Sequence, residues 1–328
     1  MASIEFSHVS KRFPGSHEAA VNDVSFTVPE GVICMLLGTS GSGKTTLLRM
    51  VNRLGDPTEG EVLIDGVPTS RQDPIKLRRG IGYVIQQVGL FPHLTIKDNV
   101  SIVPSITGTA GSGTSKRVDD LLNLVGLDPA DYRDRYPRQL SGGQQQRVGL
   151  ARALAANPDI LLMDEPFGAL DAITRSRMQS ELLQIQQEMH KTILFVTHDV
   201  EEAFQLGDEI AVLSGGKLMQ VGSPVELLAH PANDFVSRLV GGENVLRQIQ
   251  YLPVTAAAVA RPPSSPDGHG ETIPASSTLL DALLRLIETG VGSLTIVEDG
   301  QSSDEVTLRS IAGCLRFADT SREADRVG

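Results

Sequence analysis

The sequence has only two cysteines, no long apolar run and no excess of positive charge, and each absence excludes a class of protein. Cys34 and Cys314 are too few and too far apart in the chain to form a disulfide framework. No apolar run reaches the length of about 18 residues that a membrane-spanning helix needs. The first residues lack a basic segment followed by an apolar core, so we expect no signal peptide. The net charge of −11 argues against non-specific nucleic-acid binding, which depends on Lys and Arg side chains meeting phosphates. These absences predict a cytosolic protein, whose association with a membrane would come from protein partners.

The 328 residues leave room for about two domains. Short strand patterns fill residues 3–37 and end in a continuous apolar run at residues 32–37, and buried-strand patterns return at residues 160–163, 192–196 and 209–213. Such runs are typical of strands buried on both faces of a parallel sheet. Helical patterns alternate with the strands and dominate residues 90–157. The order of elements therefore predicts a layered α/β domain with a largely parallel sheet and a helical insertion.

A glycine-rich segment follows the apolar run at residues 32–37 and matches the phosphate-binding pattern G-x-x-x-x-G-K-[ST]. Its glycines let the backbone curl, so that successive N–H groups converge on phosphate oxygens. We expect Lys44 at the β- and γ-phosphates and the Thr45 hydroxyl at Mg²⁺. A strand–helix turn without a ligand is the alternative, and the buried strand before the segment and the helical pattern after it argue against that. The expected nucleotide-binding residues here are Gly38, Thr39, Ser40, Gly41, Ser42, Gly43, Lys44, Thr45 and Thr46.

A second pair of glycines, in Leu140–Gln144, also stands at the expected N-terminus of a helix. Free N–H groups and the positive end of the helix dipole make such a terminus a site for an anion. One chain therefore carries two phosphate-facing helix starts. This combination resembles the ATP-binding cassette (ABC) ATPases, in which the second motif closes over ATP held by a partner subunit. The resemblance implies a head-to-tail dimer of two copies, in which ATP bound at one copy's Lys44 is contacted by four residues of the other. These residues are Ser141, Gly142, Gly143 and Gln144.

The resemblance covers roughly residues 3–240 and implies a P-loop NTPase fold. Its parts would be a layered α/β core, an antiparallel β subdomain and a helical subdomain at about residues 90–157. Together they would form an ABC ATPase domain over residues 1–242 with ATP and Mg²⁺ as ligands.

Two carboxylates end the apolar run that begins at Ile160 and match the family's Walker B motif. The match implies that Asp164 holds Mg²⁺ through water and that Glu165 polarises the attacking water, and a residue at this position can reach that water. Two carboxylates at an ordinary strand exit are the alternative. His198 follows the strand at residues 192–197 and matches the switch histidine that contacts the γ-phosphate, although a lone histidine is more often structural.

Three further residues take roles from the same resemblance. Gln86 matches the glutamine that reaches Mg²⁺ and the water while its loop touches the membrane partner, with Gln87 as the alternative assignment. Asp171 ends the segment Gly168–Asp171, which resembles the loop that crosses the dimer. Phe13 matches the aromatic on which adenine stacks, although an isolated phenylalanine is more often a core residue.

Three longer segments resemble the importers of quaternary-amine osmoprotectants, namely glycine betaine, choline or carnitine. They are Met50–Leu54, Ile81–Thr95 and Asp164–Arg175. Repair, chromosome and translation members of the family are less favoured, because neither coiled coils, zinc-binding cysteines nor a second cassette are visible. We therefore expect the ATPase subunit of a transporter at the cytoplasmic face of the cell membrane. Its partners would be integral membrane permease subunits and, indirectly, a substrate-binding protein, with no nucleic acid. An importer of amino acids or another small solute is the alternative, because selectivity resides in other subunits.

The C-terminal region, residues 273–328, has a strand–helix–strand pattern that resembles one CBS motif. Residues 243–272 are interpreted as a linker or a degenerate partner motif. A small packing or dimerisation module is one hypothesis for the tail, and regulation by ionic strength or a nucleotide is the other. At Thr107–Ser115 the helical insertion departs from the family, and we expect a flexible loop there.

Overall fold

The structure is a computed structural model that describes residues 2–86, 89–108, 111, 113–168, 170–241, 245–260, 271–298 and 301–315. Gln87, part of the loop expected at residues 107–115, and parts of the segments 243–272 and 273–328 lie outside the described residues. Contacts divide the chain into two units, residues 1–223 and residues 224–328.

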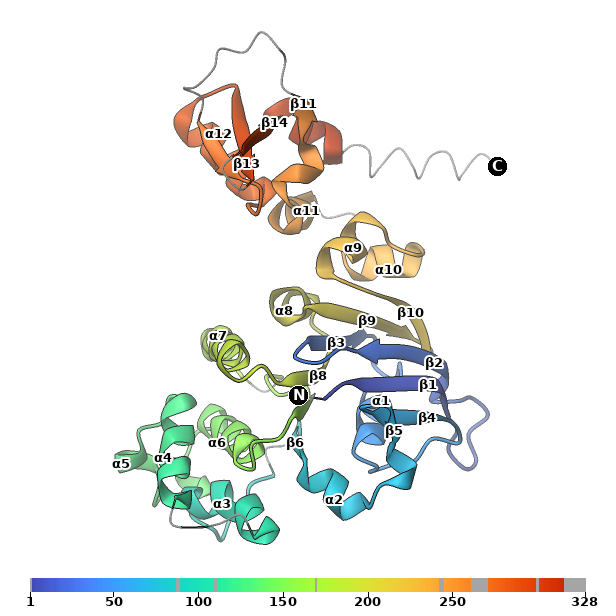
Figure 1. The fold of residues 1–328 in the computed structure, drawn as a ribbon, viewed down its shortest axis with the longest axis vertical. Coiled ribbons are helices and arrows are strands. Elements are labelled where there is room, and N and C mark those ends of the chain that lie inside the picture. The colour runs from blue at the N-terminus through green and yellow to red at the C-terminus, as the bar shows by residue number, and fades with distance from the viewer. Residues whose placement is uncertain are drawn as a thin grey trace. The chain divides into compact units, whose positions relative to one another are not determined.

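The first unit is built on a six-stranded sheet with the order β10-β9-β3-β8-β7-β6 (Figure 1). Its strands are β3 (Ile33–Gly38), β6 (Ile81–Val84), β7 (Ile160–Asp164), β8 (Thr192–Thr197), β9 (Glu209–Ser214) and β10 (Lys217–Gly222). Neighbouring strands are parallel except β9 and β10. Every residue of β3, β7 and β8 is buried, as expected of apolar strands covered on both faces. The predicted largely parallel sheet is confirmed.

A second, antiparallel sheet shares a hydrophobic core with one face of the first. Its order is β2 (Val21–Val28), β1 (Ile4–Lys11), β4 (Glu59–Ile64) and β5 (Val67–Pro68). Phe6 of β1 is buried and stacks on Phe26 with ring centroids 4.7 Å apart. The same core contains Cys34 of β3. Burial raises the pKa of the Cys34 thiol, so this side chain is a small buried hydrophobe.

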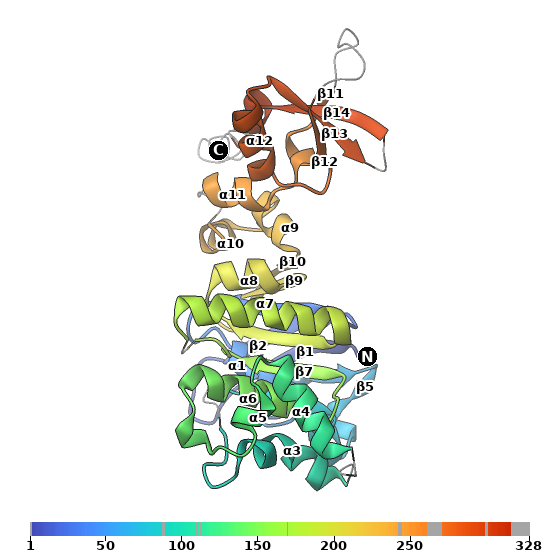
Figure 2. The same cartoon turned by 90° about the vertical axis from the view of Figure 1, so that its left-hand side faces the viewer.

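Helices cover the parallel sheet and form a separate lobe (Figures 1 and 2). Those that alternate with the strands are α1 (Lys44–Val51), α2 (Pro74–Arg79), α7 (Ala172–Met189) and α8 (Val200–Leu206). Between β6 and β7 the chain forms the lobe, in which α3 and α4 pack on α6. Its helices are α3 (Ile96–Thr107), α4 (Thr114–Leu124), α5 (Pro129–Tyr132) and α6 (Gly142–Leu154). Among the described residues, no helix combines the length and apolar character needed to cross a membrane.

The loop expected at residues 107–115 was predicted too long. Thr107 is the last residue of α3, and Thr114 and Ser115 already belong to α4. Gly108 ends α3 because it adopts the left-handed conformation at φ 74° and donates its N–H to the Pro104 carbonyl. The connection is therefore confined to residues 108–113, of which 109, 110 and 112 are outside the described residues.

The second unit contains a four-stranded sheet of order β11-β14-β13-β12. Its elements are α9 (Pro224–Ala229), α10 (Asp234–Leu239), α11 (Val245–Tyr251), β11 (Val259–Ala260), β12 (Thr272–Pro274), α12 (Leu279–Thr289), β13 (Ser293–Glu298) and β14 (Gln301–Thr307). The strand–helix–strand pattern predicted from Ile273 onward corresponds to β12, α12 and β13. Ile249, Leu252 and Val254 pack into the same core as these elements. Part of the segment interpreted as a linker is thus folded onto the tail.

Candidate functional site

The loop between β3 and α1 is shaped by glycines that have no room for a side chain. A Cβ on Gly43, whose φ is 98°, would lie 2.4 Å from the Ala20 carbonyl oxygen. A Cβ on Gly38 would lie 2.1 Å from the Leu213 carbonyl oxygen. Because both positions exclude larger residues, the backbone can turn tightly from the strand into the helix that begins at Lys44.

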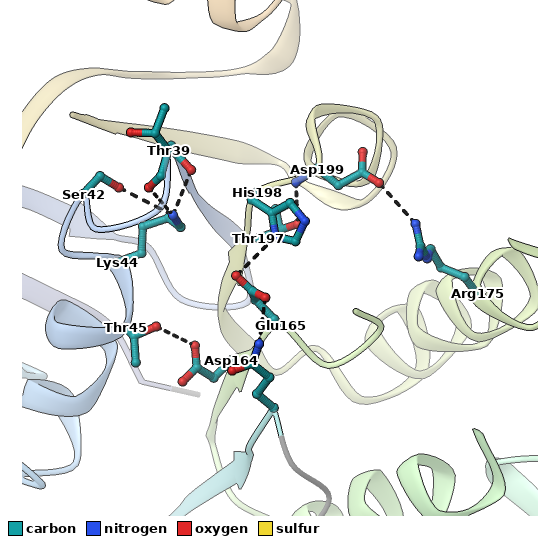
Figure 3. Close-up of polar contacts among 12 residues, drawn as sticks. Thr39, Ser42, Lys44, Thr45, Asp164, Glu165, Arg175, Thr197, His198 and Asp199 are labelled. Carbon is teal, nitrogen blue, oxygen red and sulfur yellow. Dashed lines mark hydrogen bonds and ion pairs between the residues drawn. The ribbon is translucent and has the colours of Figure 1, made fainter. Parts of the chain in front are cut away.

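The Lys44 ammonium is held by the loop that precedes it. Nζ donates to the carbonyl oxygens of Gly38 at 2.8 Å and Thr39 at 2.9 Å (Figure 3). Only 6% of Lys44 is exposed. Burial lowers the pKa of its ammonium, while the carboxylates of Glu165 and Asp164 act in the opposite direction. The loop thus places a cation next to the start of a helix, where phosphate oxygens are bound favourably.

Asp164, the last residue of β7, faces α1. Its Oδ1 accepts a hydrogen bond from the Thr45 hydroxyl at 2.8 Å, and its Oδ2 lies 3.8 Å from Nη2 of Arg49. Burial raises the pKa of the Asp164 carboxyl, and the contacts with Thr45 and Arg49 oppose that shift. Sequence reasoning missed Arg49. Its position four residues after Thr45, on the same face of a helix, was the available signal.

Glu165 brings three loops together. Its Oε2 accepts a hydrogen bond from Nε2 of Gln86 at 3.0 Å, and its Oε1 lies 3.2 Å from Nδ1 of His198 (Figure 3). The backbone of Glu165 is in the left-handed region, with φ 46°. That conformation costs about 1–3 kcal/mol in a residue other than glycine. It is fixed by the hydrogen bond from the Glu165 N–H to the Val196 carbonyl at 3.0 Å.

The second glycine pair lies in a different place in the same unit. Ser141 caps α6: its hydroxyl accepts from the Gln144 N–H at 3.3 Å, and the Gln144 side chain accepts from the Ser141 N–H at 2.9 Å. Asp171 caps α7. Asp171 and Ser141 both line one open cavity of about 530 Å³. The described residues that line the cavity are Gly126, Leu127, Tyr132, Ser141, Gly142, Gly143, Gln144, Arg147, Leu170, Asp171, Thr174 and Arg177. None of them belongs to the loop between β3 and α1, so the two glycine-rich helix starts lie at separate places in the unit.

Phe13 lies on the surface. Its side chain is 49% exposed, and the Lys11 ammonium is 5.5 Å from the ring centroid. The ring is therefore not a core residue, and about half of its surface is open to solvent.

The fold and these residues define a P-loop ATPase domain: a glycine-framed lysine, a paired threonine and aspartate, and a glutamate held between glutamine and histidine. The ABC transporter family matches residues 21–168. The choline transport ATP-binding protein OpuBA of Bacillus subtilis (strain 168) is 45% identical over 292 residues, or 89% of this chain and 74% of that protein. The glycine betaine uptake system ATP-binding protein YehX of Escherichia coli (strain K12) is 42% identical over 98% of this chain and 100% of its own length.

A solved dimeric structure, the ATP-binding cassette MJ0796 bound to ADP and Pi, has 37% sequence identity and a TM-score of 0.61. It covers 67% of this chain and 98% of its own. The chain therefore belongs to the ATP-binding subunits of ABC transporters, and it is an ATPase of that family.

Proposed function

We propose that this chain is the ATP-hydrolysing subunit of an importer for a quaternary-amine osmoprotectant such as glycine betaine, choline or carnitine. The observation that carries the catalytic part is the Glu165 carboxylate between Gln86 and His198. The importer part is supported by the relatives named for choline and glycine betaine uptake.

ATP binds with its phosphates at the loop before α1 and its adenine on Phe13. Lys44 compensates the charge of the β- and γ-phosphates. The oxygens of Thr45 and Asp164, 2.8 Å apart, suit Mg²⁺, a hard cation that prefers oxygen ligands. When bound, Mg²⁺ supplies charge neutralisation to the phosphates. The side-chain oxygen of Gln86 would be a further ligand for the cation.

Hydrolysis begins when a water hydrogen-bonded to Glu165 attacks the γ-phosphorus. Glu165 takes up the proton, and the bond between the γ-phosphorus and the ADP oxygen breaks. Gln86 and His198 contact the carboxylate on either side, so the carboxylate is oriented toward the attacking water before the reaction starts. His198 also contacts the γ-phosphate, and Lys44 stabilises the negative charge on the phosphates.

The active unit is a head-to-tail dimer, and the solved structure of the similar cassette MJ0796 is dimeric. In it, ATP at one copy's Lys44 meets the residues Ser141–Gln144 and the Asp171 loop of the other copy. Residues 1–242 form the ATPase domain, with a helical subdomain at about residues 90–157. Residues 243–272 lead to a CBS-like tail at residues 273–328, and Ile249, Leu252 and Val254 of that segment pack into the core of the tail. The protein is peripheral to the cytoplasmic face of the membrane, where the Gln86 loop and the helical lobe contact integral permease subunits.

Reconstitution tests the proposal. The chain is combined with its permease subunits in proteoliposomes, and phosphate release is measured with binding proteins loaded with glycine betaine, choline or carnitine. We expect stimulation by at least one of these and none by the empty binding proteins. Basal ATPase without stimulation by any osmoprotectant would reject the substrate class. Absence of ATPase altogether would reject the catalytic assignment.

A further inference from the structure

Arg175, near the start of α7, joins two loops that lie on different sides of the site. Its Nη2 donates to the Leu170 carbonyl at 3.2 Å. Its Nη1 lies 3.4 Å from Oδ2 of Asp199 (Figure 3). Leu170 precedes Asp171, which lines the large cavity with Ser141. Asp199 directly follows His198. One planar guanidinium can serve both acceptors because its N–H groups point in fixed, divergent directions.

Asp199 is anchored at three atoms. Its N–H donates to the Thr197 hydroxyl at 3.0 Å, its Oδ1 accepts from the Glu201 N–H at 2.9 Å, and its Oδ2 contacts Arg175. His198 stands between Thr197 and Asp199, and its side chain is 64% exposed. Since so much of the ring is exposed, the backbone on either side largely sets its position.

A small cavity of about 40 Å³ lies in the same place and is lined by Glu165 and His198 as well as by Arg175 and Asp199. The polar link through Arg175 spans the loops beside this cavity, where no side chain of the described residues fills the space between them. A second link, from Gln179 to the buried Glu202 at 3.1 Å, connects α7 with α8 independently of Arg175. Removing Arg175 should therefore leave the two helices in place.

We infer that Arg175 is a positioning residue for hydrolysis. It ties the loop ending at Asp171, which the dimer places at the partner's ATP, to His198 and Glu165 of its own copy. The inference rests on the proposed function, because it uses the proposed dimer and the roles of His198 and Glu165. Through this tie, closure of the dimer at Asp171 orients the water-binding residues, so Arg175 governs the rate of the chemical step and not the binding of ATP.

The test compares variants of the purified full-length chain. Arg175→Leu should lower kcat about 10- to 100-fold, since a misplacement of about 1 Å near a reacting group costs about 100-fold. KM and the Kd for ATP should stay within about twofold of wild type. Arg175→Lys keeps the charge but cannot reach both acceptors. Its kcat should therefore fall between those of wild type and Arg175→Leu. Asp199→Asn keeps the cap of α8. The double variant Asp199→Asn/Arg175→Leu should have a kcat no lower than that of the less active single variant.

Arg133→Leu is the matched control. Arg133 is 26% exposed against 34% for Arg175, and it also makes two side-chain contacts, with Asp119 at 2.9 Å and Ser115 at 3.0 Å. Arg133 contacts neither the loop ending at Asp171 nor the loop at His198, so the kcat of Arg133→Leu should equal that of wild type. ATP-dependent dimerisation of Glu165→Gln should survive addition of Arg175→Leu. Unchanged kcat in Arg175→Leu, or loss of that dimer, would overturn the inference. If Glu165→Gln itself hydrolyses ATP at the wild-type rate, the proposed function fails instead.

Discussion

Asp164 and Glu165 are adjacent in the chain, yet their carboxylates have different partners. Asp164 accepts a hydrogen bond from Thr45 at 2.8 Å, whereas Glu165 accepts one from Gln86 at 3.0 Å. Asp164 ends the strand, and the left-handed backbone of Glu165, with φ 46°, turns the next side chain away from it. The proposed separation of cation binding from water activation depends on this turn.

Glu165→Gln should retain ATP binding and lose about 100- to 10,000-fold in hydrolysis, because the amide is isosteric but cannot take up a proton. Phosphate release measures turnover, and gel filtration with ATP measures the dimer, which should accumulate. Glu188→Gln, on the exposed face of α7, is the control and should behave like wild type. Hydrolysis within a few-fold of wild type by Glu165→Gln would contradict the role of Glu165.

Lys44→Ala should weaken ATP binding by about 10- to 100-fold, since a hydrogen bond to a charged group contributes about 1.5–3 kcal/mol. Titration calorimetry measures the Kd. Lys217→Ala, which removes an exposed lysine of β10, should leave the Kd unchanged. Equal affinities in the two variants would show that Lys44 does not contact the phosphates.

Asp164→Asn should stabilise the ligand-free protein while abolishing Mg²⁺-dependent hydrolysis. The folded-state pKa of Asp164 is raised by burial, so its stabilising contribution is present below the unfolded pKa and lost as the pH rises through the folded pKa. At pH 7 the charge is thus a cost that the neutral amide avoids. We expect a Tm a few degrees higher at pH 7, since about 1 kcal/mol moves the Tm by about 2–4 °C, and a smaller difference toward pH 4.

Calorimetry at both pH values checks the Asp164 prediction. Asp56→Asn, which removes an exposed carboxylate paired with Arg53, should shift the Tm far less. A lower Tm for Asp164→Asn at pH 7 would mean that its contacts with Thr45 and Arg49 outweigh burial.

Phe13→Ala should reduce ATP affinity by about 5- to 100-fold, because base stacking on an aromatic side chain contributes about 1–3 kcal/mol. Phe13→Tyr should retain affinity. Neither variant should change the Tm by more than a degree or two, because the ring is already 49% exposed. ATP and GTP should be affected alike, and unaltered nucleotide binding in Phe13→Ala would exclude stacking at this position.

Ser141→Arg should leave ATP binding to a single chain intact and prevent the ATP-dependent dimer in the Glu165→Gln background. The long cation would enter the space proposed for the partner's phosphates, and loss of the cap costs α6 about 0.5–2 kcal/mol. Light scattering with and without ATP gives the molar mass of the particle and so distinguishes the monomer from the dimer. A full yield of dimer would place the partner's nucleotide elsewhere.

Much of the fold could be predicted, because a strand that is buried on both faces is a continuous run of apolar residues in the sequence. The runs at residues 160–163 and 193–196 contain no polar residue, and they lie within β7 and β8. The loop at residues 107–115 was predicted too long, because its glycines and small polar residues do not show where Gly108 stops one helix and where Thr114 starts the next. The exposure of Phe13 could not be predicted from the sequence either, since an isolated aromatic residue fits a core equally well.

The sequence by itself determined the parallel α/β sheet, the phosphate loop ending in Lys44 and Thr45, and the resemblance to the ABC family, because each depends on residues that are contiguous or periodic. Only the tertiary structure decided which side chains meet. Gln86 and Glu165 are 79 positions apart and touch because β6 and β7 are neighbours in one sheet. The bridge from Leu170 through Arg175 to Asp199 depends on how α7 and α8 pack, and no spacing along the chain encodes that distance.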